Sequence, residues 1–500
     1  MIETHISWVF IAAPFVFKVK KPVDLGFLDF STLEKRHHFC RRELDLNGRL
    51  CSDVYLAVVP IYQNNAGFSF DDDGGEIAEY AVKMRELPAN NSLGELIARG
   101  AVGNMEINRV LARLRRFYES QTPTPQIEEW GRLETLKIST DENFAQGQSS
   151  VGKTISPLAF DAIRHFTNNF YAAHRQLFDE RIEQRRIRDC HGDLHLDHVH
   201  LTPDEVIIFD CMEFNDRFRF IDIANDLAFL AMDLDFERQH KLSDLLLRNA
   251  AREFGDPGML QLADFYKCYR AFVRGKVESI QATSEEHAQR ARRYFHLALR
   301  YATVGSQPIV LVVMGGIATG KSSIAKQLAQ EMGFPFYSSD KIRKTVAGVP
   351  LTVRTPTELR AKVYSQATTD QTYRQLLRDA FAALEAHSGV ILDATFSNQA
   401  ERDLLRDKCA ESGIGLRLIE LQASPEQIIA RLEARNAAAA EISDARLEDF
   451  EKLNAAYEAP SEFGDAITVA SGETVLETTR AILLCLADRQ SSSVKNSTVP

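Results

Sequence analysis

A glycine-rich segment in the second half of the chain has the spacing of a phosphate-binding loop. The residues that would line it are Gly315, Gly316, Ile317, Ala318, Thr319, Gly320, Lys321, Ser322 and Ser323. In the pattern G-x-x-x-x-G-K-S, backbone N–H groups surround phosphates, the lysine reaches their outer oxygens and the serine hydroxyl is a ligand for Mg²⁺. An apolar run over 309–314 precedes the loop and a helical pattern over 321–333 follows it. This order of elements is the context that the motif requires, so the segment predicts a site for ATP and Mg²⁺.

Further side chains suited to phosphoryl transfer follow this loop. The run 390–392 predicts a second buried strand, and Asp393 directly after it is a candidate metal ligand. The next residue is Ala394, whereas motor ATPases usually place a water-polarising glutamate there. The sequence therefore favours transfer to a bound acceptor over hydrolysis. Asp340 and Arg343 belong to a run Ser-Ser-Asp-Lys-Ile-Arg, in which Asp340 is also suited to cap a helix.

Residues 308–485 resemble the branch of P-loop kinases that is related to polynucleotide kinase, gluconate kinase and zeta toxins. The phosphate loop, residues 338–343 and residues 392–396 carry the resemblance. It implies that Asp340 is the general base beside the acceptor hydroxyl and that Arg343 holds an acceptor or phosphate group. It also implies that Lys321, Arg431 and Arg435 offset charge on the transferring phosphoryl group. Taken alone, the last two arginines also suit a solvated helix face.

Histidine and aspartate residues gather between positions 191 and 210. Asp193 lies in a His-Gly-Asp loop, and Asp210 follows a β-rich run over 206–209. In kinase-fold phosphotransferases a loop aspartate faces the acceptor hydroxyl, and an aspartate after the next strand holds metal ions. A transition-metal site is the alternative, and its candidate ligands are His191, His195, His198, His200, Asp193 and Asp197.

Over about residues 1–300 the chain resembles the aminoglycoside phosphotransferase family. The His-Gly-Asp loop and residues 222–228, which match a D-x-x-x-D-L-A helix start, carry this resemblance. It implies a protein-kinase-like fold in which Asp193 is the base and Asp210 is a metal ligand. Position 198 is a second metal-ligand position, and His198 stands there where the family has asparagine.

The same resemblance assigns a nucleotide-binding pair near the amino terminus. Lys18 fits the strand lysine that reaches the nucleotide phosphates, and Glu43 fits its partner on the following helix. Lys20, on the same face of the strand, is the alternative to Lys18. The predicted hairpin over 6–20 begins only a few residues after Met1, so we expect a truncated or reduced small lobe.

The length of the chain and a break in its pattern over residues 304–308 predict two domains. The chain has 500 residues, of which 45% are hydrophobic and 26% are charged. We expect an α+β, protein-kinase-like domain over 1–303, a linker over 304–308 and an α/β P-loop domain with a parallel sheet flanked by helices over 309–488. The tail over 489–500 is expected to be disordered. Helices are expected over 76–120 and 157–187, and four arginines are expected on a solvated face, namely Arg181, Arg185, Arg186 and Arg188.

The charge balance and the cysteines limit the class of partner and compartment. A net charge of −11 disfavours general nucleic-acid binding, and no apolar run reaches the length of a membrane span. The seven cysteines are scattered, with no C-x-x-C spacing, which is typical of reduced thiols. The sequence therefore predicts a cytoplasmic protein.

These observations together predict an ATP-dependent, bifunctional phosphotransferase (a kinase of class EC 2.7) that uses Mg²⁺ and acts on a small hydroxylated acceptor. A nucleic-acid 5′-hydroxyl end is the less favoured acceptor. Two other hypotheses remain open. Residues 1–303 could form a regulatory or ligand-binding pseudokinase, or the P-loop domain could be an ATPase switch without an acceptor. The sequence does not specify the acceptor, any coupling of the two sites or the oligomeric state.

Overall fold

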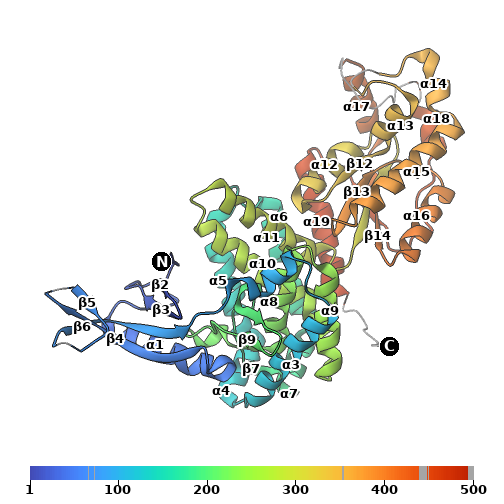
Figure 1. Ribbon diagram of the computed structural model, residues 1–500. Helices are drawn as coiled ribbons and strands as arrows, with labels where there is room; N and C mark the ends of the chain where they lie inside the picture. The colour runs from blue at the N-terminus through green and yellow to red at the C-terminus, as the bar shows by residue number, and fades with distance from the viewer. Residues whose placement is uncertain (66, 73, 352–353, 438–447, 449, 494–500) are drawn as a thin grey trace. The chain divides into compact units, whose positions relative to one another are not determined.

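The computed structural model describes residues 1–500 except 66, 73, 352–353, 438–447, 449 and 494–500 (Figure 1). The chain divides into two compact units. The amino-terminal unit comprises Met1–Glu142 and His174–Arg270, and the P-loop unit comprises Asn143–Ala173 and Ala271–Val494. Residues 143–173 and 271–303, which the sequence analysis places in the first domain, thus pack with the P-loop segment.

An antiparallel sheet begins the amino-terminal unit, with strand order β1-β2-β3-β6-β4-β5. Its strands are β1 (Ile2–Glu3), β2 (Ser7–Ala12), β3 (Phe15–Lys20), β4 (Tyr55–Asn64), β5 (Gly67–Ser69) and β6 (Glu76–Arg85). The predicted hairpin is present as β2 and β3, in which Val9 pairs with Lys18. Because β3 also pairs with β6, both of its edges are hydrogen-bonded, and this fixes the direction of the lysines that it carries.

The segment 76–85, expected to be helical, is strand β6 in the structure. It lies between β3 and β4, and β4 pairs with it over residues 76–84 while β3 pairs with residues 81–85. Ala81 and Val82 are fully buried there. The apolar residues of this run fit a helix as well as a strand. The segment becomes a strand because β3 and β4 hydrogen-bond to it on either side.

Helix α1 (Leu33–Cys51) follows the hairpin and contacts β4 and β6. Thr32 caps it by accepting a hydrogen bond from the backbone N–H of Lys35, which satisfies one of the free donors of the first turn. Glu43 and Asn47 are fully buried on this helix. Helix α1 therefore brings a carboxylate and an amide against the sheet.

The rest of the amino-terminal unit is mostly helical, with two short strand pairs, β7 with β10 and β8 with β9. The strands are β7 (Ile187–Asp189), β8 (Val199–Leu201), β9 (Val206–Ile208) and β10 (Phe220–Asp222). The helices are α2 (Leu93–Ala98), α3 (Asn104–Ser120), α4 (Pro125–Glu128), α7 (Arg175–Glu183), α8 (Ile223–Phe236) and α9 (His240–Glu253). Short 3₁₀ turns lie at Ala89–Asn91, Glu129–Gly131, Leu196–His198 and Asp216–Phe218. Every residue of α8 is buried, so this helix is the centre around which the unit packs.

Five parallel strands form the sheet of the P-loop unit, in the order β12-β13-β11-β14-β15. They are β11 (Ile309–Gly315), β12 (Phe336–Ser338), β13 (Gly389–Asp393), β14 (Gly415–Gln422) and β15 (Ile467–Ala470). All seven residues of β11 are buried, as expected for a central strand covered on both faces. The carboxyl ends of these strands meet at one edge, where ligands bind in open parallel sheets.

The remaining helices belong to the P-loop unit or contain a boundary between the units. They are α5 (Leu133–Gly147), α6 (Pro157–Ala173), α10 (Gly258–Ile280), α11 (Glu285–Thr303), α12 (Lys321–Met332), α13 (Ser339–Ala347), α14 (Thr357–Val363), α15 (Gln366–Ala383), α16 (Gln399–Glu411), α17 (Pro425–Ala437), α18 (Phe450–Ala455) and α19 (Val475–Ser492), with a 3₁₀ turn at Gln148–Ser150. Helices α6 and α11 contact α19.

The end of the chain differs from the prediction. Helix α19 continues to Ser492, so residues 489–492 of the expected disordered tail are helical. Residues 494–500 lie outside the described part. Over the residues that are described, none of the helices combines the length and apolarity needed to cross a membrane.

Candidate functional site

The phosphate-loop motif lies between β11 and α12, at the carboxyl edge of the parallel sheet. The Nζ atom of Lys321 donates to the carbonyl oxygen of Gly316 at 2.6 Å. Arg431 donates to the carbonyl oxygen of Ala318 at 3.3 Å, and the Ser471 hydroxyl donates to that of Thr319 at 2.7 Å. In a trans peptide unit the N–H group points away from the carbonyl. These bonds therefore set the directions of the N–H groups that would surround a phosphate.

Gly315 allows the chain to turn out of the sheet. Its φ of 142° lies in a region that side chains disfavour, and a Cβ atom here would collide with the backbone oxygen of Leu421 on β14. Gly320 also has a positive φ, 96°, where α12 begins. The spacing of these glycines is thus explained by backbone geometry, as the motif predicts.

Asp393 ends strand β13 next to the phosphate loop. In the sheet it pairs with Val313 of β11 on one side and with Ser338 of β12 on the other. Its carboxylate is 3% exposed, and its Oδ2 atom accepts a hydrogen bond from the Ser338 hydroxyl at 3.0 Å. Ser338 was not predicted to have a role. Asp340 follows it by two residues in the first turn of α13, so one short segment carries both the orienting hydroxyl and the expected base.

Arg343 lies one turn further along α13 and is largely buried. Its Nη1 atom donates to the Thr369 hydroxyl at 2.8 Å, and its guanidinium stacks over the Tyr364 ring at 5.1 Å. Its Nε atom is buried without a hydrogen-bond partner in the described residues. Arg343 is therefore held beside α14 and α15 with its Nε–H group left for an anionic or polar group.

Of the two arginines expected to offset charge on the phosphoryl group, Arg431 contacts the phosphate loop through the bond to Ala318 described above. Arg435 is on the same helix, α17, but its side chain lies outside the described residues. Ser322 and Ser323 belong to the first turn of α12. Hydroxyl and carboxylate oxygens are the donors that Mg²⁺ prefers, so Ser322 and Asp393 fit that ion.

A second group of predicted residues meets in the amino-terminal unit. Lys18 on β3 donates to Asp210 Oδ1 at 2.6 Å and lies 2.9 Å from Glu43 of α1. Burial alone would raise the pKa of Asp210, but the charges of Lys18 and His198 outweigh it and hold that pKa well below its ordinary value. Asp210 has a φ of 61°, a left-handed conformation that costs free energy and is often found at functional sites.

Lys20, the predicted alternative to Lys18, also pairs with Glu43, at 2.7 Å. Its side chain is completely buried and contacts Glu213 as well. Burial raises the pKa of Glu213 above its ordinary value. Lys20 therefore fixes Glu43 from inside the unit, while Lys18 faces Asp210. Glu213 is a participant that the sequence analysis missed, because nothing in its local pattern distinguishes it from a surface glutamate.

The His-Gly-Asp loop brings Asp193 close to His195 and His198. Asp193 Oδ2 lies 3.6 Å from His195 Nε2 and 3.7 Å from His198 Nδ1. The other ring nitrogen of His198 is 3.5 Å from Asp210 Oδ2. Burial lowers the pKa of His198 to about 4, and the nearby His195 adds to this effect. A chain of contacts thus joins Lys18, Glu43, Asp210, His198 and Asp193.

This loop is held by buried polar side chains. Asp226 accepts from the backbone N–H groups of His191 and Gly192 at 3.0 and 2.9 Å. Arg270 donates to the carbonyl oxygen of Gly192 at 3.1 Å. Gly192 has a φ of 87°, and a Cβ atom there would lie 2.7 Å from the backbone oxygen of Phe218. The segment 222–228, singled out in the sequence, therefore supports the loop.

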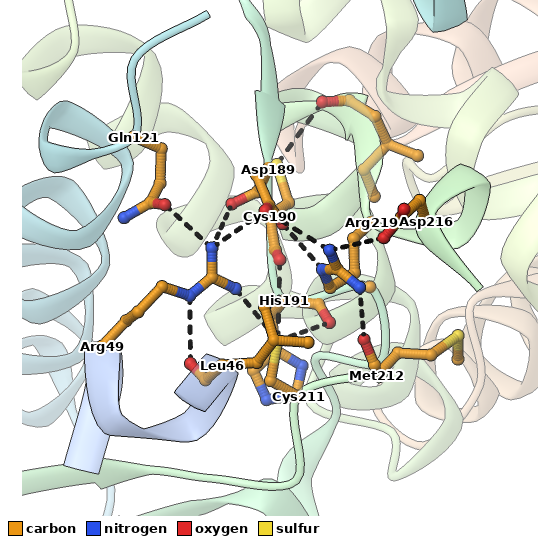
Figure 2. Close-up of polar contacts among 12 residues, drawn as sticks. Leu46, Arg49, Gln121, Asp189, Cys190, His191, Cys211, Met212, Asp216 and Arg219 are labelled. Atoms are coloured by element: carbon orange, nitrogen blue, oxygen red, sulfur yellow. Dashed lines mark hydrogen bonds and ion pairs between the residues drawn. The ribbon is translucent and has the colours of Figure 1, made fainter. Parts of the chain in front are cut away.

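Asp189 joins helix α1 to the chain on both sides of the loop. Figure 2 shows Arg49 and Arg219 on either side of its carboxylate, at 3.2 and 2.7 Å. Arg219 also donates to the carbonyl oxygen of Met212 at 2.9 Å, and Asp216 pairs with it. The clamp formed by Arg49, Asp189 and Arg219 ties α1, β7 and the segment after Asp210 together.

One predicted surface cluster is wrong in part. Arg181 was expected on a solvated face but is 1% exposed. It binds both oxygens of Asp222 at 2.8 Å and also pairs with Asp256. These paired carboxylates compensate the loss of water around the guanidinium.

Comparisons with known proteins bear on both units. Residues 310–460 match the family model of an AAA domain, AAA_33. Two curated proteins, uncharacterized protein Rv2004c of Mycobacterium tuberculosis and uncharacterized protein Mb2027c of Mycobacterium bovis, are each 31% identical to this chain over 450 residues. Each match covers 89% of this chain and 88% of the relative.

Solved structures resemble part of the chain. A gluconokinase from Sinorhizobium meliloti is 21% identical, covering 36% of this chain and 93% of the gluconokinase, with a TM-score of 0.26. A shikimate kinase from Aquifex aeolicus is 15% identical, covering 37% of this chain and all of the shikimate kinase, with a TM-score of 0.27.

The AAA match begins within β11 and includes the phosphate loop, Ser338 and Asp393, so residues 310–460 form a P-loop nucleotide-binding domain. The mycobacterial match extends over both units. This chain therefore belongs to the family of Rv2004c and Mb2027c, whose carboxy-terminal part in this chain is a P-loop AAA domain.

Proposed function

We propose that this chain is an ATP-dependent phosphotransferase whose P-loop unit transfers a phosphoryl group to a small hydroxylated acceptor. The observation that carries this proposal is the bond between Ser338 and Asp393, 3.0 Å long. It links the segment that bears Asp340 to the strand end beside the phosphate loop. A candidate base and a candidate metal ligand are thereby held at the edge of the sheet where the loop begins, an arrangement suited to phosphoryl transfer.

Each side chain has a stated task in this proposal. Lys321 leaves the carbonyl of Gly316 and binds the outer phosphate oxygens, and Arg431, already at the loop, offsets negative charge there. Asp340 accepts the proton of the acceptor hydroxyl, and Arg343 offers its Nε–H group to the acceptor. Mg²⁺, which Ser322 and Asp393 would hold, supplies positive charge next to the transferring group.

The residues after Asp393 favour transfer over hydrolysis. Ala394 and Phe396 are each 1% exposed, and the Phe396 N–H donates to the Tyr373 hydroxyl at 3.1 Å. The position after Asp393 thus belongs to the core and carries no group able to polarise water. We propose an acceptor of the class for which gluconokinase and shikimate kinase are named, a small hydroxylated compound.

A second phosphotransferase site is proposed in the amino-terminal unit, with the fold of aminoglycoside phosphotransferases. The contacts of Lys18 with Asp210 and Glu43 favour it. In kinase-fold enzymes a strand lysine likewise lies near a helix glutamate and a metal-binding aspartate. In this arrangement Asp193 faces the acceptor hydroxyl. The alternative is a regulatory pseudokinase, which would bind a nucleotide or ligand without transferring phosphate.

The test uses labelled ATP and the full chain with a panel of sugars, nucleosides, aminoglycosides and oligonucleotides. Three variants separate the sites: Lys321→Ala, Asp340→Asn and Asp193→Asn. We expect label transfer to a small acceptor that Lys321→Ala and Asp340→Asn each lower by about 100-fold or more, while Asp193→Asn retains it.

Loss of transfer in Asp193→Asn alone would move the activity to the amino-terminal unit. Phosphate release that no acceptor stimulates, with Lys321→Ala inactive, would instead make the P-loop unit an ATPase switch. Equal label transfer by all four proteins would overturn both proposed sites.

A further inference from the structure

Three side chains of the His-Gly-Asp loop present donor atoms to one point in the amino-terminal unit. One atom each from Asp193, His195 and His198 lies within 4.8 Å of the other two. The rings of His195 and His198 are 3.8 Å apart between centroids, and His195 is buried. A cation with bonds of about 2.0–2.2 Å in tetrahedral geometry holds its ligand atoms about 3.4 Å apart. The separation of 3.6 Å between Asp193 Oδ2 and His195 Nε2 is close to that value.

The hydrogen bonds of His198 indicate which nitrogen could bind a cation. Its Nδ1 atom lies 2.9 Å from the carbonyl oxygen of Asp193, and a carbonyl only accepts, so Nδ1 carries the proton. Metal-bound histidines usually donate their other N–H to such a partner. The Nε2 atom then points its lone pair toward Asp210 Oδ2 at 3.5 Å. Two electron-rich atoms facing each other at this distance require positive charge between or beside them.

Lys18 supplies positive charge to Asp210, but on the side of the carboxylate away from His198. It donates to Asp210 Oδ1, which leaves Oδ2 directed at His198. A second proton on His198 would satisfy the contact, and so would a metal cation. The two possibilities differ in a measurable way, because only the second requires His195 and Asp193.

Other histidines of the sequence cluster do not join this group. His191 uses both ring nitrogens, Nε2 with the carbonyl of Phe209 at 2.8 Å and Nδ1 with the backbone N–H of Asp193 at 3.2 Å. His200 lies on β8 and packs edge-on against Phe209 at 5.4 Å. The fold thus selects three ligands from the six residues that the sequence offered.

The chemistry of these donors differs from that of a magnesium site. Mg²⁺ prefers oxygen ligands in octahedral geometry, whereas two imidazoles and a carboxylate suit borderline cations such as Zn²⁺. His198 stands where the resembling family has asparagine, so the amide oxygen that Mg²⁺ needs is missing. The donors present do not fit Mg²⁺ at this position.

We propose that Asp193, His195 and His198 bind one borderline divalent cation of the Zn²⁺ class. Three protein ligands leave a fourth position for water or a bound molecule, as in catalytic rather than structural zinc sites. The backbone bonds from His191 and Gly192 to Asp226 hold the loop that carries the ligands. This inference does not rest on the proposed activity of the P-loop unit. A cation bound to Asp193 would take that carboxylate away from the acceptor-facing role proposed above for the amino-terminal unit.

The test is a Zn²⁺ titration of the metal-free full chain, without an affinity tag, against a chromophoric chelator. Co²⁺ is added in a parallel titration, because tetrahedral Co²⁺ absorbs visible light strongly. We expect one tight equivalent of Zn²⁺ and a visible Co²⁺ band. Replacing a ligand should cost more than the about 10–100-fold that loss of a supporting partner costs. His198→Asn and His195→Gln are therefore each expected to weaken Zn²⁺ binding by about 100-fold or more.

His200→Gln is the matched control, since it removes a buried histidine on the adjacent strand but no ligand. It should keep the affinity and the Co²⁺ band of the unchanged chain. Asp193→Asn provides a third ligand variant, and near-ultraviolet circular dichroism shows which variants are folded. The proposal is overturned if the chain binds no stoichiometric Zn²⁺, or if folded ligand variants bind as tightly as His200→Gln.

Discussion

The Nε2 atom of His198 lies 3.5 Å from the Oδ2 atom of Asp210. The two residues approach from different elements: His198 ends a 3₁₀ turn, and Asp210 follows strand β9. Lys18 of β3 occupies the other carboxylate oxygen. Asp210 is therefore the residue on which the sheet and the loop converge.

The low pKa of His198 predicts an acid-sensitive native state. Burial lowers the folded-state pKa to about 4, while the unfolded chain takes up the proton near its ordinary value of about 6.5. The unfolded state thus binds more protons between these values, so the stability from this group is complete above pH about 6.5. This stability is lost as the pH falls from about 6.5 to about 4. The difference between the folded and unfolded pKa of His198 corresponds to about 3 kcal/mol of unfolding free energy.

The measurement is urea unfolding of the metal-free protein at pH 7 and pH 4.5. His198→Asn removes this titration, so its free energy of unfolding should fall less between the two pH values than that of the unchanged chain. Parallel losses in the two proteins would show that His198 protonates equally easily in both states. His200→Gln serves as a comparison on the neighbouring strand.

Gly315→Ala should disrupt the phosphate loop. A methyl group there collides with the Leu421 backbone on β14, and the φ of 142° is strained for alanine. We expect a loss of about 1–3 kcal/mol in stability and weaker ATP binding, measured by urea unfolding and calorimetry. Gly464→Ala is the control, since nothing lies within 4 Å of its added Cβ. Equal behaviour of the two variants would contradict the geometry described for the loop.

Ser338→Ala should reduce activity through Asp393. The lost hydrogen bond goes to a charged and buried carboxylate, and such bonds contribute about 1.5–3 kcal/mol. We expect a lower rate of phosphoryl transfer and a higher Mg²⁺ concentration for half-maximal activity, both read from initial rates. Thr345→Ala removes a hydroxyl that donates within the same helix, to the Lys341 carbonyl, and should change neither quantity. An unaltered Mg²⁺ dependence in Ser338→Ala would show that this serine does not orient Asp393.

Asp189→Ala should destabilise the amino-terminal unit by breaking the clamp in Figure 2. The Arg219 side chain is 2% exposed and that of Asp189 is 20% exposed. Because Arg219 keeps Asp216 and the Met212 carbonyl as partners, we expect a loss of about 1.5–3 kcal/mol, the contribution of a hydrogen bond to a charged group. The double variant Asp189→Ala with Arg219→Leu should lose less than the sum of the two single variants. Urea unfolding measures all three proteins.

The exposed pair of Asp53 with Arg85 is the comparison for this clamp. Asp53 is 55% exposed, and surface pairs contribute at most about 1 kcal/mol, so Asp53→Ala should have a small effect. Additive losses in the Asp189 double variant would mean that the two side chains act independently.

The prediction from sequence was more complete for the P-loop unit than for the amino-terminal unit. Gly315, Lys321 and Ser322 form one continuous loop, so their spacing along the chain is also their spacing in space. Asp393 could be placed because it ends a continuous apolar run that only a buried strand explains. Ser338 was missed, since its role depends on the pairing of β12 with β13, which no local pattern records.

In the amino-terminal unit, local patterns were ambiguous. Residues 76–85 fit both helical and strand periods, and pairing on both sides makes them strand β6. Arg181 belongs to an arginine-rich run of the kind found on solvated helix faces. It is nevertheless buried, where it pairs with Asp222 and Asp256 from distant segments. Lys18 and Lys20 share a strand face, and only the positions of Glu213 and Asp210 assign them different partners.

Neighbouring residues alone are enough to identify the phosphate loop, the strand that leads into it and the His-Gly-Asp loop as candidate sites. These depend on short-range backbone geometry, which neighbouring residues encode. The tertiary structure alone decided that Asp193, His195 and His198 converge, that His191 and His200 do not, and that Asp210 lies between Lys18 and His198. Such convergence depends on packing between segments up to about two hundred residues apart, whose free energy comes from burial and is not written in any one segment.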